Sequence, residues 1–156
     1  MSRFEQRLSE LGISLPERDW QGGKLYSCRQ EGNLLFCGGF GPTDPDGVVR
    51  LKGKLGRELS VEQGYTAARN CAVVTMAYVK SYLGDLDRIA GVVKVNGYVN
   101  STDTFTEPGK VIDGYSDLWL EVLGEAGRHA RVSVPVVSLA SNIAVEVDCV
   151  LKLSDG

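Results

Sequence analysis

Histidine and closely spaced cysteines are scarce in this sequence, and their scarcity argues against a metal site. The chain has one histidine, His129, and no CxxC pair. A tetrahedral zinc site takes three or four such ligands, commonly at short spacings. We therefore expect no metal site. The cysteines are interpreted as small buried hydrophobic residues in a reducing cytosol, and they are Cys28, Cys37, Cys71 and Cys149.

Long hydrophobic runs are also missing. The stretch "CAVVTMAYV" is closed by Lys80, well short of the roughly 18 to 20 apolar residues that a membrane helix requires. The opening "MSRFEQRLSELG" alternates charged and apolar residues, unlike a signal peptide. We expect a cytoplasmic protein that is not a membrane protein.

Positive charge is too sparse to predict a nucleic-acid surface. The net charge is -3 and the sequence pI is about 5.2, whereas nucleic-acid binding rests on clustered Lys and Arg. One basic cluster, "RLKGKLGRE" at 50–58, is interrupted by Gly53 and Gly56. We interpret it as a solvated hairpin or turn.

The residues that are present predict one α+β domain over 1–156, because 156 residues with 43% hydrophobic content can bury a core. Ser60 and Gln63 form a capping box before a long apolar periodicity, and Pro108 suits a first helical turn. Strand-like runs surround these helices. The expected helices are 2–12, 60–84 and 108–124, and the expected strands are 24–30, 34–40, 47–56, 90–100, 128–136 and 143–151.

The order of these elements favours a mostly antiparallel sheet with two main helices on one face. There is no sustained strand-helix alternation and no GxGxxG motif, so a doubly wound nucleotide-binding fold is disfavoured. Two helices cover one side of such a sheet, and the other side is then either polar or covered by another subunit. Four aromatic residues lie in strand-like segments, and we therefore expect an oligomer in which another subunit covers this second face. They are Tyr26, Phe36, Phe40 and Tyr98.

The last two strand-like runs, in "RHARVSVPVVSLASNIAVEVDCVL", resemble neighbouring strands with a polar face. Because side chains alternate between the two faces of a strand, Arg131 and Ser133 should lie on the face opposite the valines of the first strand. Glu146 should likewise lie opposite the valines of the second strand. Arg131 would then lie opposite 146–148, on the same face as Glu146. Two interpretations stay open, a solvated cross-strand ion pair and a guanidinium held in a site. His129 is interpreted as solvated rather than as a base.

Several blocks in sequence resemble the Rid (reactive intermediate deaminase) family, also called YjgF or endoribonuclease L-PSP, which has a chorismate-mutase-like fold. The blocks are "YSCRQEGNLLFCGGFGPTDPDG", "VVKVNGYVNSTDTF" and "HARVSVPVVSLASNIAVEVDCVL". The resemblance covers a core at 24–153 and leaves a helix and loop addition at 1–23.

The resemblance implies a homotrimer with clefts between subunits that hydrolyses 2-imino acids to 2-oxo acids and ammonia, without a cofactor. It places the carboxylate-binding arginine at Arg131 and the water-placing glutamate at Glu146. It also implies substrate contacts from Tyr26, Gly38, Gly39 and Ser133.

The sequence departs from the family pattern at pocket positions, which puts the substrate in doubt. A serine of the family is Gly38 here, a glutamine is Phe40, an asparagine is Ile112, and a common cysteine is Ser133. Two alternatives therefore accompany the deaminase: a non-catalytic trimer that binds a small carboxylate, and an endoribonuclease, which the acidic composition disfavours.

Overall fold

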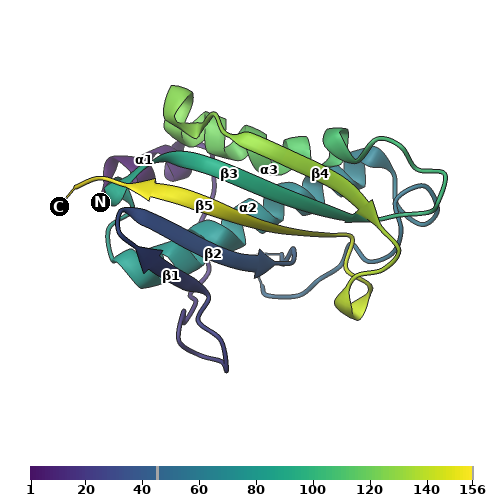
Figure 1. The fold of residues 1–156 in the computed structure, drawn as a ribbon, viewed down its shortest axis with the longest axis horizontal. Coiled ribbons are helices and arrows are strands. Elements are labelled where there is room, and N and C mark those ends of the chain that lie inside the picture. Colours follow the sequence, from purple (N-terminus) through teal and green to yellow (C-terminus); the bar gives the residue numbers. More distant parts are fainter. Residues whose placement is uncertain (45, 156) are drawn as a thin grey trace.

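The protein has an α+β fold in which helices cover one face of a five-stranded sheet (Figure 1). The structure is a computed structural model, and it describes residues 1–44 and 46–155. The elements are α1 (Arg3–Glu10), β1 (Cys28–Glu31), β2 (Leu34–Phe40), α2 (Val61–Leu83), η1 (Leu86–Arg88), β3 (Ile89–Asn100), α3 (Pro108–Leu123), η2 (Gly124–Gly127), β4 (Ala130–Val136), η3 (Ala140–Asn142) and β5 (Val145–Leu153).

The ends of the two main helices follow their local sequence signals. The Gln63 amide donates to Ser60 Oγ at 3.2 Å, and the Ser60 amide donates to Gln63 Oε1 at 2.9 Å, so the predicted capping box is present. α2 ends at Leu83 and is capped by Gly84, whose φ of 75° suits glycine. α3 begins at Pro108, as predicted. Within the described ranges, no helix is both long enough and apolar enough to cross a membrane.

The sheet is mixed, with strand order β1-β2-β5-β3-β4. Three of its pairings are antiparallel, and β3 pairs with β4 in parallel. The prediction that the last two strands are neighbours is wrong, because β3 lies between β4 and β5. β3, α3 and β4 form a strand-helix-strand crossover that places β4 on one side of β3 and leaves the other side to β5.

Two further predicted strands differ from the structure. The run 47–56 forms no strand and contributes only single bridges, from Lys52 to Ile143 and from Leu55 to Leu59 and Ser101. Three glycines within this run break its backbone, and two of them, Gly53 and Gly56, lie in the basic cluster with a positive φ above 80°. β1 begins at Cys28 rather than at residue 24, so Tyr26 lies in the preceding loop.

The core lies between the sheet and the helices α2 and α3, which Figure 1 shows behind the strands. Along β5, alternate residues face this core, and all five are buried: Val145, Val147, Cys149, Leu151 and Leu153. Glu146 and Asp148 therefore lie on the open face of the sheet. All four cysteines are free and buried, as the sequence predicts.

Helices α2 and α3 pack closely because glycine occupies their crossing point. A Cβ at Gly114 would lie 2.0 Å from the carbonyl oxygen of Tyr65. Beside this contact, the Tyr65 hydroxyl donates to Asp117 at 2.6 Å, and this hydrogen bond, together with burial, raises the pKa of Tyr65 to about 12. The crossing thus tolerates no side chain at position 114.

Substitution of this glycine should destabilise the fold. Gly114→Ala gains about 1 kcal/mol of helix propensity, but the backbone clash forces α2 and α3 apart. We expect the free energy of unfolding to fall by about 2 kcal/mol or more in urea denaturation. Gly109→Ala, in the same helix with only Arg131 Nη2 at 3.5 Å, is the matched control and should keep wild-type stability or exceed it. A Gly114→Ala protein as stable as wild type would contradict the close crossing.

Candidate functional site

Arg131 is held against helix α3. It pairs with Val95 of β3, which is fully buried, so both side chains point toward the helix layer. Its guanidinium donates from Nη1 to Asp113 Oδ1 at 2.9 Å and to Ser116 Oγ at 3.0 Å, and from Nη2 to the Gly109 carbonyl at 3.2 Å. The Arg131 side chain is only 23% exposed. The interpretation of Arg131 as a solvated strand residue is therefore wrong.

Ser116 links Arg131 to the single histidine. His129 Nδ1 lies 2.7 Å from the Gly127 carbonyl oxygen, and Nε2 lies 2.8 Å from Ser116 Oγ. A carbonyl only accepts, so Nδ1 carries the proton, Nε2 accepts from the Ser116 hydroxyl, and that hydroxyl accepts in turn from Arg131. Burial lowers the pKa of His129 and Arg131 lowers it further, while the bond to Gly127 opposes both. The interpretation of His129 as merely solvated is also wrong.

A shallow cavity opens beside this cluster. Its volume is about 260 Å³, and two arginines and two aspartates lie around it. The sequence reasoning missed the α3 residues of this site. The signal for them was helical spacing, because Gly109, Asp113 and Ser116 recur at intervals of four and three along one helix. The cavity is lined by Asp113, Ser116, Asp117, Leu120, Arg128, His129 and Arg131.

Glu146 lies on the other face of the sheet from Arg131. Arg131 aligns with Val95, and Val95 aligns with Cys149 of β5, so Cys149 shares the face of Arg131. Glu146 is three residues from Cys149 and therefore points to the opposite side. The prediction that Arg131 and Glu146 share a face is wrong because the intervening strand β3 changes the register that a direct pairing would give.

Polar residues gather around Glu146 on the open face. Asn96 donates to Asp148 Oδ1 at 2.8 Å, and the Tyr98 hydroxyl donates to Asp148 Oδ2 at 3.3 Å. Burial raises the pKa of Tyr98, and the carboxylates of Asp148 and Glu146 raise it further. The open face of the sheet therefore carries two neighbouring carboxylates, those of Glu146 and Asp148.

The remaining predicted site residues divide between these two faces. Ser133 follows Arg131 on the helix side, and its Oγ is buried with no partner among the described residues. A Cβ at Gly39 would lie 3.2 Å from the Glu146 carboxyl group, so Gly39 and Glu146 are adjacent. The Gly38 amide donates to the Ser27 carbonyl at 2.9 Å, and Tyr26 is 60% exposed.

Of the positions that depart from the family pattern, one lies in the core and another packs against it. Ile112 is fully buried. It fills the space beside Gly97, where an added Cβ would lie 2.5 Å from Ile112 Cγ1. Phe40 stacks on Tyr78 of α2, with ring centroids 4.6 Å apart. Both residues thus stabilise packing where the family has polar groups. Nowhere in residues 1–44 and 46–155 do three His, Cys, Asp or Glu side chains converge as metal ligands would.

Comparisons with known proteins agree on one family. Residues 5–151 match the family described as "YjgF/chorismate mutase-like, putative endoribonuclease". Protein TCP17 of Trypanosoma cruzi is 41% identical over 154 residues, which cover 98% of this chain and 96% of that protein. A crystal structure of a protein of unknown function from Agrobacterium tumefaciens is 40% identical, covers 97% of this chain and 94% of that one, and has a TM-score of 0.90.

A more distant structure shares the fold alone. E. coli TdcF with bound serine is 17% identical, with 91% of this chain and 100% of that chain covered and a TM-score of 0.61.

The link between Arg131 and His129 through the Ser116 hydroxyl can be tested by NMR, since the chain has one histidine. Arg131→Met removes a nearby positive charge, so the pKa of His129 should rise from its lowered value. Arg128→Met, which removes an exposed neighbouring charge, is the matched control and should leave the titration unchanged. Equal shifts in both variants, or no shift in Arg131→Met, would contradict this link.

Proposed function

The chain belongs to the YjgF/chorismate mutase-like family, and we propose that it hydrolyses reactive 2-imino acids to 2-oxo acids and ammonia. The single observation that carries the proposal is the position of the Arg131 guanidinium. It is fixed at the edge of the sheet beside a cavity, and some of its N–H donors are unpaired. Arg131 uses three N–H groups on Asp113, Ser116 and Gly109. Two of its five N–H groups have no partner among the described residues.

The two remaining donors suit a substrate carboxylate. A charge-assisted hydrogen bond to a guanidinium contributes about 1.5 to 3 kcal/mol. E. coli TdcF, which has the same fold, holds serine, a small molecule with a carboxylate. A small 2-imino acid anchored through its carboxylate on Arg131 is consistent with both points.

Hydrolysis requires a water molecule placed next to the imine carbon. Water adds to the C=N carbon, the nitrogen takes up protons, and the C–N bond breaks to release ammonia and leave the 2-oxo acid. Glu146 is the carboxylate that accepts the proton from this water. Because imines are reactive, positioning and proton transfer suffice, and the reaction uses no metal or organic cofactor.

Arg131 and Glu146 lie on opposite faces of the sheet, so the proposed cleft combines two copies of the chain. Arg131 lies on the edge strand β4, where a neighbouring copy can present its own open face with Glu146, Gly39 and the preceding Tyr26. A head-to-tail contact of this kind closes into a ring when the rotation allows. The proposed assembly is the homotrimer, with Arg131 and Ser133 from one subunit and Glu146 from the next.

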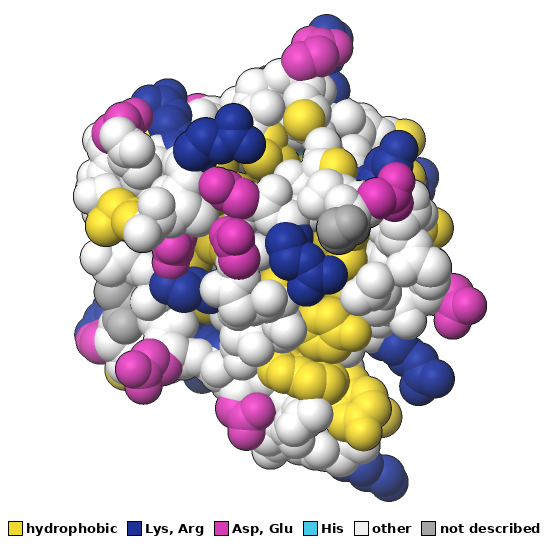
Figure 2. All heavy atoms as spheres, turned by 90° about the vertical axis from the view of Figure 1, so that its left-hand side faces the viewer, with side chains coloured by type: hydrophobic (Ala, Val, Ile, Leu, Met, Phe, Trp, Pro, Cys, Tyr) yellow, Lys and Arg dark blue, Asp and Glu magenta, His cyan; other side chains and the backbone are white. Residues whose placement is uncertain are grey.

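RNA cleavage has weaker support, although the family description includes endoribonuclease. The end of the molecule in Figure 2 shows positive and negative side chains intermingled, with one cluster of hydrophobic side chains. RNA-binding proteins present a positive surface to the phosphates, and the net charge here is -3.

Carboxylate binding without turnover is the second candidate. Its support is that Ile112 is buried in the core, that Phe40 packs against the core, and that Gly38 has no side chain. Three polar groups of the family are therefore missing. Freshly generated 2-iminobutanoate distinguishes the two candidates, because the deaminase releases ammonia and the binding protein does not.

Substitution of Arg131 should remove the activity. Arg131→Ala should lower kcat/KM for 2-iminobutanoate at least a hundredfold, because the carboxylate loses its charged partner. Sedimentation should still show a trimer. Arg3→Ala, whose side chain is 92% exposed and does not line this cavity, is the matched control and should keep full activity. Wild-type rates in Arg131→Ala would refute the site, and a wild-type monomer at micromolar concentration would refute the cleft.

A mixing experiment tests whether the site is shared between subunits. Arg131→Ala and Glu146→Gln homotrimers should each be inactive. When the two are unfolded, mixed in equal amounts and refolded, about a quarter of the clefts should combine an intact Arg131 with an intact Glu146. The expected result is recovery of about a quarter of the wild-type rate. Mixed trimers that stay inactive would show that the two residues do not serve one cleft.

A further inference from the structure

Four polar side chains lie next to one another on the open face of the sheet, where β3 pairs with β5. Tyr98 is directly opposite Glu146, and Asn96 is directly opposite Asp148. Residues directly opposite on antiparallel strands have their Cβ atoms about 4.5 to 5.5 Å apart. All four residues are half-buried, so their side chains still reach solvent. The hydrolysis proposed above uses only Glu146 of this group, which leaves the other three without a role.

The register that places Tyr98 opposite Glu146 is fixed at Asn100, further along β3. Asn100 is fully buried. Its backbone amide donates to the Ala144 carbonyl at 2.9 Å, and its side chain donates to the Ile143 carbonyl at 3.1 Å. Because these bonds join β3 to the segment that leads into β5, the two strands cannot slip past each other.

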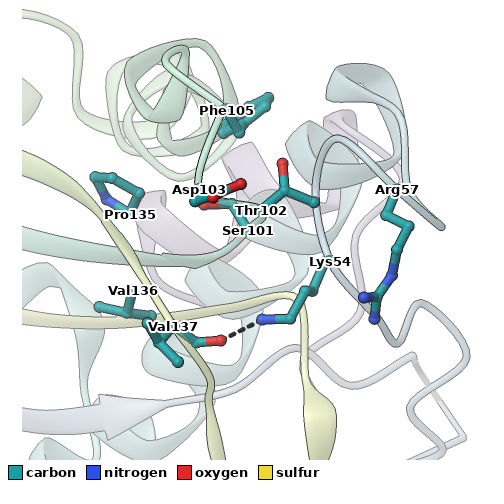
Figure 3. A pocket seen from close by; sticks show the side chains of 9 residues that line it. All are labelled: Lys54, Arg57, Ser101, Thr102, Asp103, Phe105, Pro135, Val136 and Val137. Carbon is teal, nitrogen blue, oxygen red and sulfur yellow. Dashed lines mark hydrogen bonds between the residues drawn. The ribbon is translucent and has the colours of Figure 1, made fainter.

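Lys54 holds the same end of β3 from the other side. Its ammonium donates to Asn100 Oδ1 at 2.8 Å and to the Val137 carbonyl, a bond drawn in Figure 3. Lys54, Ser101 and Val137 are part of the lining of a cavity of about 430 Å³ at this end of the strand (Figure 3). The end of β3 is therefore tied both to the segment before β5 and to the segment after β4.

Asp148 accepts hydrogen bonds on both of its carboxyl oxygens. Asn96 donates to Oδ1 at 2.8 Å, and the Tyr98 hydroxyl donates to Oδ2 at 3.3 Å. Burial raises the pKa of Tyr98, and the nearby carboxylates of Asp148 and Glu146 raise it further, so the hydroxyl keeps its proton at neutral pH. In the described part of the chain, Glu146 has no side-chain hydrogen bond, so its carboxylate is available to bind water.

The Tyr98 oxygen can accept a hydrogen bond on this face. Its proton is directed to Asp148, which leaves the acceptor lone pairs of the hydroxyl unused. A water molecule beside Glu146 can donate one O–H to that carboxylate and the other to Tyr98. The lone pair of this water then points away from both acceptors. Gly39 leaves room for the water, because a Cβ there would lie only 3.2 Å from the Glu146 carboxyl group.

We infer that Tyr98 is a further catalytic residue, whose hydroxyl oxygen binds the attacking water together with Glu146. The inference rests on the proposed function. The water oxygen forms a bond to the imine carbon, the proton on its Glu146 side passes to that carboxylate, and the electron pair of the C=N bond moves to the nitrogen, which takes up a proton from solvent. The other O–H stays on Tyr98. Asp148 and Asn96 are positioning residues that keep the Tyr98 hydroxyl turned away from the water.

The kinetics of Tyr98→Phe with freshly generated 2-iminobutanoate test this role. The value of kcat should fall about tenfold, because one hydrogen bond to the attacking water is lost. KM should stay within about twofold of wild type, since Arg131 anchors the carboxylate. Tyr82→Phe removes the same hydroxyl from helix α2, where the ring packs on Trp20. It is the matched control and should keep the wild-type kcat.

Asp148→Asn tests the direction of the Tyr98 hydrogen bond. Asn96 continues to donate to the oxygen that it faces, so the introduced amide turns its nitrogen toward Tyr98 and donates to the phenolic oxygen. The hydroxyl then presents its proton to the water instead of a lone pair. We expect kcat to fall about tenfold, and addition of Tyr98→Phe to this variant should cause no further fall. If Tyr98 served packing alone, its substitution would cost the same in both backgrounds.

Three outcomes in a wild type that releases ammonia would overturn the inference and leave the proposed function in place. They are a wild-type kcat in Tyr98→Phe, a raised KM at unchanged kcat in that variant, and an equal loss from Tyr98→Phe in the Asp148→Asn background. A wild type that releases no ammonia would refute the proposed function and this role of Tyr98 with it. Thermal melts establish that each variant is folded, and Tyr98→Phe stays informative if Asp148→Asn is not.

Discussion

The position of β3 in the sheet is the constraint on which the rest of this structure depends. β3 pairs with β5 on one side and with β4 on the other, in opposite directions. The crossover through α3 makes the β4 pairing parallel. As a result β4 forms one edge of the sheet, α3 lies over that edge, and Arg131 meets Asp113 and Ser116. The carboxyl ends of β3 and β4 also meet, which creates the cavity around Lys54 and Ser101.

The same constraint separates the two residues that the family resemblance assigns to one reaction. A strand between β4 and β5 places Arg131 against the helices and Glu146 on the open face. In a single chain these groups cannot act on one small molecule, so the proposed chemistry depends on assembly. In the proposed assembly the open face, with Tyr98, Asp148 and Glu146, forms one wall of the cleft.

The core residues explain why this chain differs from the family pattern. Ile112 fills the space above Gly97, and Phe40 stacks on Tyr78. Each replaces a polar group of the family pattern with packing, while Asp113, Ser116 and His129 form a hydrogen-bonded network around the arginine. The region of Arg131 thus combines a guanidinium held by α3 with nearby positions where packing replaces polar groups.

The sequence alone determined the local structure and the family. Capping at Ser60, proline at 108 and the alternation in β5 act over a few residues, so helix limits and buried faces could be predicted from them. The blocks that resemble the Rid family were equally visible. The strand order could not be predicted from the sequence. The short polar connection between β4 and β5 is compatible both with a hairpin and with passage across the end of another strand. Only the tertiary structure decided that β3 intervenes, that His129 is held by Ser116 of α3, and that Lys54 and Ser101 line one cavity. These contacts join residues distant in sequence, and no local pattern encodes such a pairing.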